Sequence, residues 1–338
     1  MKFVKLIAFS CLFLALSGCG GVTTQNRLST PSTPLTPSTP AEATSLSNMT
    51  GEETLSGFSS VTSKRIENNF LESKIVNDAT IVINNNTNEI RLILSQELTN
   101  NEIFDLDVTV DLDTDVFFEN DGIATIGKRL DDGNSISLYY LIPGEVQAAG
   151  DAYNYTTGAF WVLTNENTNA IDVGFIVSGF ETEPDDMPIS GSAVYNVIAQ
   201  ALISYGGDDG WAYRASGTGD FNVSFATGEM IGNFPLLNIT DFDGDALVLK
   251  DQTSSLGGFS LEGSISSGSS HFSGTTYRAA GGNTLLPEMN GTFSGSFFGP
   301  DANEIGGAFI LEVEDADSIG GNLFLTGGFI GKMQDPVR

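Results

Sequence analysis

The stretch GTFSGSFFGPDANEIGGAF, residues 291–309, determines the fold class of this chain. It predicts two short strands, near 290–298 and 306–313, that flank a Gly299-Pro300 turn. In such a turn glycine permits unusual backbone angles and proline fixes the direction of the chain. Gly295 lies inside the first strand, where glycine is expected only if the strand must bend sharply. Small closed antiparallel barrels need such bends, and closure also removes exposed strand edges.

The same pattern extends to both sides of this stretch. Short apolar-alternating segments spaced by roughly 8–12 residues predict a sandwich or a barrel. Gly263, Gly274 and Gly328 also lie inside apparent strands, so we expect an antiparallel barrel of about eight strands. The segments lie near 192–204, 214–226, 229–237, 245–250, 257–265, 270–278, 290–298 and 306–313, with a last one near 322–331.

The strand faces opposite the apolar residues are polar, as Asn222, Ser224 and Ser260 illustrate. A membrane-embedded barrel would instead show an outward apolar band with aromatic girdles. We therefore predict a soluble barrel and keep the embedded barrel as the less favoured alternative.

In residues 58–185, short apolar segments alternate with Asn, Asp and Gly turn signals, and this pattern predicts a second all-β domain. Residues 105–115 alternate acidic and apolar side chains with period two, as in a half-buried strand. A short helix around 63–71 is a weaker expectation. Of the 39 glycines, 26 lie at or beyond Gly191, and Pro184 and Pro188 flank this change. We therefore place the domain boundary near residue 185 and the barrel domain at 186–338.

The N-terminus has the features of an export signal. Lys2 and Lys5 precede an apolar run from 6 to 16, which is too short to span a bilayer and fits a cleaved signal. The run ends in LSGC, residues 16–19, which resembles the lipobox of bacterial lipoproteins. That resemblance implies a signal peptide at 1–18 and acyl chains such as palmitate on Cys19. Gly20, which follows, is not the Asp that often retains such proteins at the inner membrane, so the expected location is the outer membrane, with cell-surface exposure open.

Residues 19–57 are expected to form a tether, because their Ser, Thr and Pro cannot bury enough surface to fold. The mature chain would contain no cysteine other than Cys19, and hence no disulfide and no thiolate metal site.

Charge excludes one class of partner. The sequence has 43 acidic and 14 basic residues, for a net charge of −29, and loss of the signal peptide makes it −31. A polyanion of this size is repelled by phosphate backbones, so we expect no nucleic-acid partner. Steering of a cationic partner is a less favoured alternative to simple solubility.

Three segments together resemble the transferrin-binding protein B family. Residues 291–309 are similar to its barrel signature GxFxGxFYGPxAxExGGxF, with Phe298 in place of the usual Tyr. Residues 327–332 (GGFIGK) are similar to its closing strand, and residues 186–195 (DMPISGSAVY) to the start of its barrel. The resemblance implies a surface lipoprotein with one lobe: a handle-like β domain at 58–185, then an eight-stranded barrel filled by side chains.

Two residues are candidate site residues. His271 is the sole histidine, and no Gly-x-Ser-x-Gly elbow accompanies it, so we expect a surface strand residue and no catalytic triad. Glu304 is expected to accept backbone N–H bonds inside its own turn, as a structural residue.

Acidic clusters were considered as metal sites. Residues 241–245 (DFDGD) resemble the start of a calcium loop, but an EF-hand needs Gly and Glu where Ala246 and Gln252 stand, so a hairpin turn is favoured. Asp111, Asp113 and Asp115 are expected on one strand face in contact with solvent. No metal, cofactor or catalytic residue is predicted, although paired carboxylates are not excluded among so many acids.

These observations predict a non-catalytic, lipid-anchored binding protein. Its ligand would be a protein or a haem- or iron-type nutrient, and neither the ligand nor the oligomeric state follows from the sequence. The alternative is a structural or adhesive surface lipoprotein without a small-molecule ligand. An enzyme is the least favoured reading.

Overall fold

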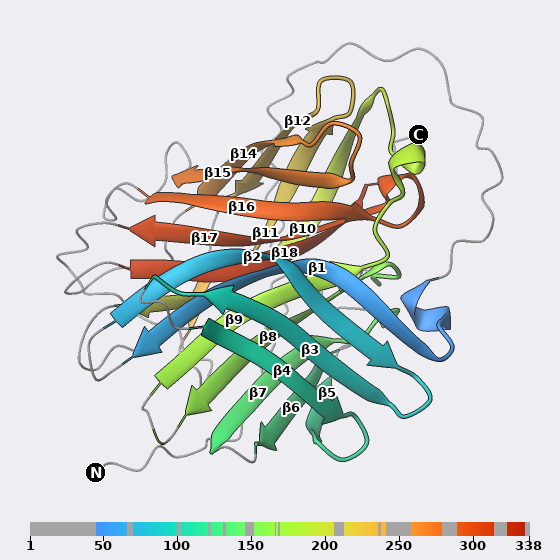
Figure 1. Ribbon diagram of the computed structural model, residues 1–338. Coiled ribbons are helices and arrows are strands. Elements are labelled where there is room, and N and C mark those ends of the chain that lie inside the picture. The colour runs from blue at the N-terminus through green and yellow to red at the C-terminus, as the bar shows by residue number, and fades with distance from the viewer. Residues whose placement is uncertain are drawn as a thin grey trace.

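The computed structural model describes residues 45–334, with gaps at 66–69, 100–102, 121–122, 131–132, 146–151, 166, 168–169, 206–212, 236–237, 241–257, 279–288 and 314–322. The described chain is almost entirely β, as the sequence predicts, and its strands form two nine-stranded sheets. Figure 1 shows one sheet above the other, with β1, β9 and β18 near their junction. Among the described residues, no helix is long and apolar enough to cross a bilayer.

The first sheet, here called the first lobe, is antiparallel and curls around an apolar core. Its strand order is β4-β3-β2-β1-β9-β8-β7-β6-β5, so the earliest strand pairs with the last and the two outer strands are neighbours in sequence. Its core includes Trp161, Leu138 and Ile176, all with side chains that are completely buried. The strands are β1 (Glu52–Arg65), β2 (Phe70–Asn84), β3 (Glu89–Glu97), β4 (Ile103–Asp111), β5 (Val116–Asn120), β6 (Ile123–Arg129), β7 (Asn134–Leu141), β8 (Thr156–Asn165) and β9 (Ala170–Gly179).

The second sheet closes into the predicted barrel of eight antiparallel strands, because β10 pairs with both β18 and β11. The short β13 pairs with β11 on the same edge as β12 and continues the line of β12, so it lengthens one strand of the ring and adds no further strand. This barrel lobe consists of β10 (Ser192–Tyr205), β11 (Tyr213–Ser224), β12 (Glu229–Phe234), β13 (Asn238–Thr240), β14 (Phe259–Ile265), β15 (His271–Arg278), β16 (Met289–Phe298), β17 (Glu304–Val313) and β18 (Leu323–Met333).

Phenylalanine rings fill the barrel. Phe329 is fully buried, and its ring centroid lies 4.8 Å from that of Phe221 and 6.4 Å from those of Phe234 and Phe272. Glycines face these rings: a Cβ at Gly295 would lie 2.5 Å from the Phe272 ring and 2.3 Å from the Gly306 carbonyl oxygen. The glycines that marked the barrel in the sequence therefore permit close approach of strand and ring.

Three local expectations need correction. None of the described residues in the range 63–71 is helical, because Ser63–Arg65 belong to β1 and β2 begins at Phe70. The expected strand at 105–115 ends at Asp111, where a turn begins. The range 19–57, expected to be a tether, is folded in its last part. A 3₁₀ turn, η1 (Leu46–Asn48), precedes β1, and Leu46 and Leu55 are buried in the first-lobe core.

Other expectations fall outside the described residues or remain proposals. The signal peptide, Cys19 and most of the tether lie before residue 45, and the expected strand at 245–250 lies in a gap. The division into a domain at 58–185 and a barrel domain at 186–338 remains our proposal.

Candidate functional site at the junction of the lobes

The two lobes meet along a shared apolar layer. Phe175 and Val177 of β9 pack against Ala308 of β17 and Ile330 of β18, and all four are buried. The Phe175 ring also occupies the space in which a side chain at Gly328 would lie, at 2.0 Å from its Cβ position. The lobes therefore interlock, and only glycine fits at that position of β18.

Buried hydroxyl groups line another part of the junction. Ser60 of β1 donates through its hydroxyl to the Gly327 carbonyl (2.8 Å), and the hydroxyls of Thr62 and Thr326 are in contact. Thr182, in the connection between the lobes, donates to the Gly299 carbonyl (2.7 Å). These bonds satisfy polar groups that the packed lobes withdraw from water.

Glu304 links the lobes through a buried carboxylate. Its side chain is 1% exposed, and the Asn154 N–H donates to Oε1 at 2.8 Å. The N–H groups of Tyr155 and Thr156 donate to Oε2 at 3.0 and 2.9 Å. Burial raises the pKa of Glu304, although the hydrogen bonds from residues 154–156 and the charge of Lys332 act in the opposite direction.

The prediction that Glu304 accepts backbone N–H bonds is therefore confirmed, but the predicted location of the donors is wrong. Glu304 accepts backbone N–H bonds, but they come from the loop before β8 in the first lobe and not from its own turn. Gly299 begins that turn with φ +75, and its N–H donates to the Phe180 carbonyl (2.8 Å). A side chain at Gly299 would meet the Tyr155 ring. The segment 299–304 is thus one of the contacts between the barrel lobe and the first lobe.

His271 lies near the same end of the junction as the 299–304 turn, because its partner Glu181 pairs with Phe298 just before Gly299. Its Nε2 is 2.8 Å from Glu181 Oε2, and its ring meets Phe58 of β1 edge-on with centroids 5.4 Å apart. The side chain is 48% exposed, so His271 is a surface strand residue as predicted. Its contacts with the connection and with the first lobe were not predicted, because they depend on how the lobes dock.

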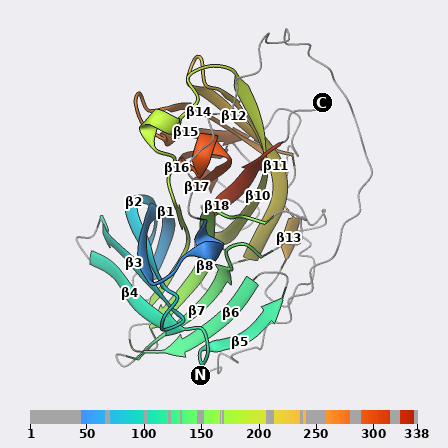
Figure 2. The same cartoon turned by 90° about the vertical axis from the view of Figure 1, so that its right-hand side faces the viewer.

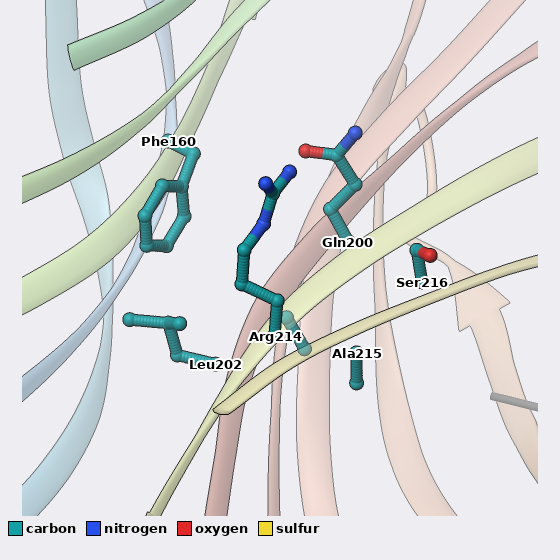
Figure 3. Close-up of a pocket in the computed structure, with 7 residues that line it drawn as sticks. Phe160, Gln200, Leu202, Arg214, Ala215 and Ser216 are labelled. Carbon is teal, nitrogen blue, oxygen red and sulfur yellow. The ribbon is translucent and has the colours of Figure 1, made fainter. Parts of the chain in front are cut away.

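A small cleft opens between the lobes beside β10 and β11 (Figure 3). The space within it is about that of one water molecule, which is far smaller than a small-molecule ligand requires. The Arg214 guanidinium lies over the Tyr139 ring of β7, 5.6 Å from its centroid. The cleft is lined by Phe160, Gln200, Ala201, Leu202, Arg214, Ala215 and Ser216.

The acidic cluster at 111–115 forms a turn. The Asp111 N–H donates to Asp115 Oδ2 (3.0 Å), the Asp113 N–H donates to Asp111 Oδ1 (2.8 Å), and Lys128 Nζ donates to Asp115 Oδ2 (3.1 Å). The three aspartates therefore do not share one strand face, which corrects the expectation. Across the described residues, no group of three or more potential metal ligands is assembled. Residues 241–245 lie outside the described residues.

Comparison with known proteins bears on the barrel lobe. Residues 187–332 match the family model described as the C-lobe and N-lobe β barrels of Tf-binding protein B. Residues 187–332 have a Tf-binding protein B-like barrel fold. This confirms the resemblance seen in residues 186–195, 291–309 and 327–332, and it shows that the Glu304 link lies within a Tf-binding protein B-like barrel.

Solved structures similar to this chain share little sequence with it. Transferrin binding protein B from Haemophilus parasuis is 16% identical with a TM-score of 0.45, and the alignment covers 78% of this chain and 55% of that one. Transferrin binding protein B from serogroup B Neisseria meningitidis is 15% identical with a TM-score of 0.35, and the alignment covers 77% of this chain and 53% of that one. HpuA from Kingella denitrificans, solved in complex with human haemoglobin, is 12% identical with a TM-score of 0.34. That alignment covers 88% of this chain and 90% of HpuA. This chain thus spans about half the length of those two transferrin binding proteins. No curated protein sequence matches it.

Proposed function

We propose that this protein is a non-catalytic binding lipoprotein, anchored through Cys19 in the outer membrane and recognising a protein or a haem- or iron-type nutrient ligand at its surface. The observation that carries the proposal is the match of residues 187–332 to the barrels of Tf-binding protein B, a protein named for its binding partner. A fold alone does not fix a function, so the proposal also needs support from the site.

The filled barrel supports surface recognition. Phe221, Phe293 and Phe329 occupy the interior and are fully buried, so the described interior contains packed rings where a ligand-binding barrel would have a cavity. The interlobe cleft contains one arginine, a glutamine and a serine beside aromatic rings, which suits hydrogen bonding to a partner's surface groups better than acid–base chemistry. A protein partner is therefore favoured over a small ligand.

The test is capture of a partner by intact cells. Cells that express the epitope-tagged full chain are incubated with host or culture fluid, washed, and solubilised, and captured proteins are identified by mass spectrometry. We expect one abundant protein with the wild type and loss of cell-associated capture with Cys19→Ser, which cannot carry the anchor. Incubation of the purified protein with haem, read as a Soret band, distinguishes haem binding. Absence of both would favour the structural or adhesive alternative.

The anchor has its own measurement. Mass spectrometry of the purified mature protein should show an N-terminal Cys19 with two or three acyl chains, since one chain binds membranes only marginally. An unmodified N-terminus elsewhere would contradict the anchoring proposal.

A further inference from the structure

The curled sheet of the first lobe has two outer strands. β4 pairs only with β3 and β5 only with β6 within the part of the chain that the structure describes. Figure 2 shows β4 and β5 at opposite ends of the sheet. Of the two, β4 is the longer, with nine residues, and it therefore presents the longer row of outward backbone groups.

The hydrogen bonds at the end of β4 show which of its backbone groups face outward. The Leu112 N–H donates to the Asn88 carbonyl on the β3 side, whereas the Thr109 carbonyl accepts from Lys128 on the other side. In an antiparallel pair, the side to which backbone groups point alternates with each residue. Ile103, Asp105 and Asp107 therefore direct their N–H and C=O groups away from β3, as Thr109 does.

β4 is held rigidly by its inward side chains. Phe104, Leu106 and Val108 are each at most 5% exposed, and the Phe104 ring stacks on the fully buried Trp161 with centroids 5.5 Å apart. An edge fixed in this way loses little conformational freedom when another strand pairs with it. This edge is therefore organised for pairing before a partner arrives.

The outward side chains give the edge a chemical character. Ile103 is 70% exposed, and Asp105 and Asp107 are exposed beside it. Arg91 bonds Asp107 through two nitrogens, at 2.6 and 2.5 Å, and this contact lowers the pKa of that carboxyl group. No side-chain partner of Asp105 is present among the described residues. A second copy of β4 would bring aspartates together, which disfavours self-association, whereas basic side chains would be attracted.

We propose that the β4 edge, residues 103–107, binds an extended segment of a protein partner in which basic and apolar residues alternate. The segment pairs with the outward backbone groups as an added strand, with its basic residues beside Asp105 and Asp107 and its apolar residues toward the first-lobe core. The inference rests on the proposed binding function and names a surface and a partner chemistry for it.

The test uses the purified mature chain and a fluorescent ten-residue peptide of alternating valine and lysine. Binding is measured by fluorescence anisotropy, and its site by hydrogen exchange of the β4 amides. We expect the peptide to bind and to slow exchange at 103, 105 and 107. A peptide of alternating valine and glutamate, and a valine–lysine peptide methylated on alternate backbone nitrogens, should each bind at least tenfold more weakly.

Two variants of one residue separate backbone pairing from charge. Asp105→Pro removes an outward N–H but no bond to β3, which is where an edge strand tolerates proline. It should weaken peptide binding about tenfold, whereas Asp105→Asn, which removes only the charge, should weaken it about threefold. Glu229→Lys, a larger charge change on the exposed surface of the barrel lobe, should leave binding within a factor of two.

The inference is overturned if the methylated peptide binds as tightly as the unmethylated one, or if protection appears elsewhere in the chain. The methylated-peptide comparison uses the wild-type protein, so it remains decisive if Asp105→Pro fails to fold. The proposed function fails separately, if wild-type cells capture no partner. If wild-type and Asp105→Pro cells capture the same partner equally well, the function holds and the β4 edge is not its site.

Discussion

The two lobes wrap a sheet around an apolar core in different ways. In the barrel lobe, pairing of β10 with β11 completes the ring, whereas the first lobe keeps β4 and β5 as free edges. The residues that fill the cores differ as well: phenylalanine rings against glycines in the barrel, and mostly Ile, Leu and Val in the first lobe. Glycine allows strands to bend and rings to approach closely, so the composition of each strand set determines whether the sheet can close.

This contrast predicts that the same Leu→Ala substitution will lower the free energy of unfolding by different amounts in the two cores. Leu261 of the barrel and Leu138 of the first lobe are both fully buried. Leu261→Ala should lower the free energy of unfolding by about 4 kcal/mol and Leu138→Ala by about 2.5 kcal/mol, because a closed ring relaxes less around a cavity. Urea unfolding of both variants gives the comparison. Equal losses would show that closure does not stiffen the core.

The next largest effect is expected at the link between the lobes. Glu304→Gln places an amide NH₂ group among the N–H donors of residues 154–156, which leaves some of them unsatisfied. We expect a loss of about 2–3 kcal/mol in the free energy of unfolding. Hydrogen exchange at Asn154, Tyr155 and Thr156 should accelerate, whereas Glu229→Gln, on the exposed barrel surface, should change neither quantity.

Glu304 also gives the junction a pH dependence. Because burial raises its pKa, the folded protein binds the proton at a pH at which the unfolded chain does not. That stabilisation is fully present below the ordinary glutamate pKa and is lost as the pH rises through the folded-state pKa. The stability of the wild type minus that of Glu304→Gln should therefore increase as the solution is acidified through this window. A difference independent of pH would mean that Glu304 titrates alike in both states.

The smallest expected stability changes concern two hydroxyl groups near the junction, one hydrogen-bonded and one not. The Thr182 hydroxyl donates to the Gly299 carbonyl, whereas the fully buried Ser178 hydroxyl has no hydrogen-bond partner among the described residues. Thr182→Val should cost about 1 kcal/mol in the free energy of unfolding, and Ser178→Ala should be neutral or slightly stabilising. Thermal unfolding of both variants tests this, and an equal cost for the two would contradict the assignment.

Sequence reasoning located the barrel strands well, because alternating Phe and Val positions and internal glycines report local geometry. It missed β13, whose three residues carry too little pattern, and it mistook part of β1 for a helix. At 111–115 it extended a strand through a turn that is stabilised by carboxylate-to-backbone bonds.

The junction could be predicted only in part. Glu304 was singled out by its place after Gly299 and Pro300, but its donors lie about 150 residues earlier in the chain. The contact of His271 with Phe58 likewise depends on docking of the lobes. Such contacts have no local signature, since they arise only when separately folded surfaces meet.

The order in which strands pair has a consequence for biogenesis. β1 completes its pairing only with β9, and β10 completes its pairing only with β18, the last strand that the structure describes. The first lobe can therefore finish folding only after β9 has been synthesised, and the barrel lobe only after β18. Topologies dominated by distant pairings also fold slowly. Under the export that we propose for this chain, slow pairing of distant strands favours translocation before a stable tertiary structure forms.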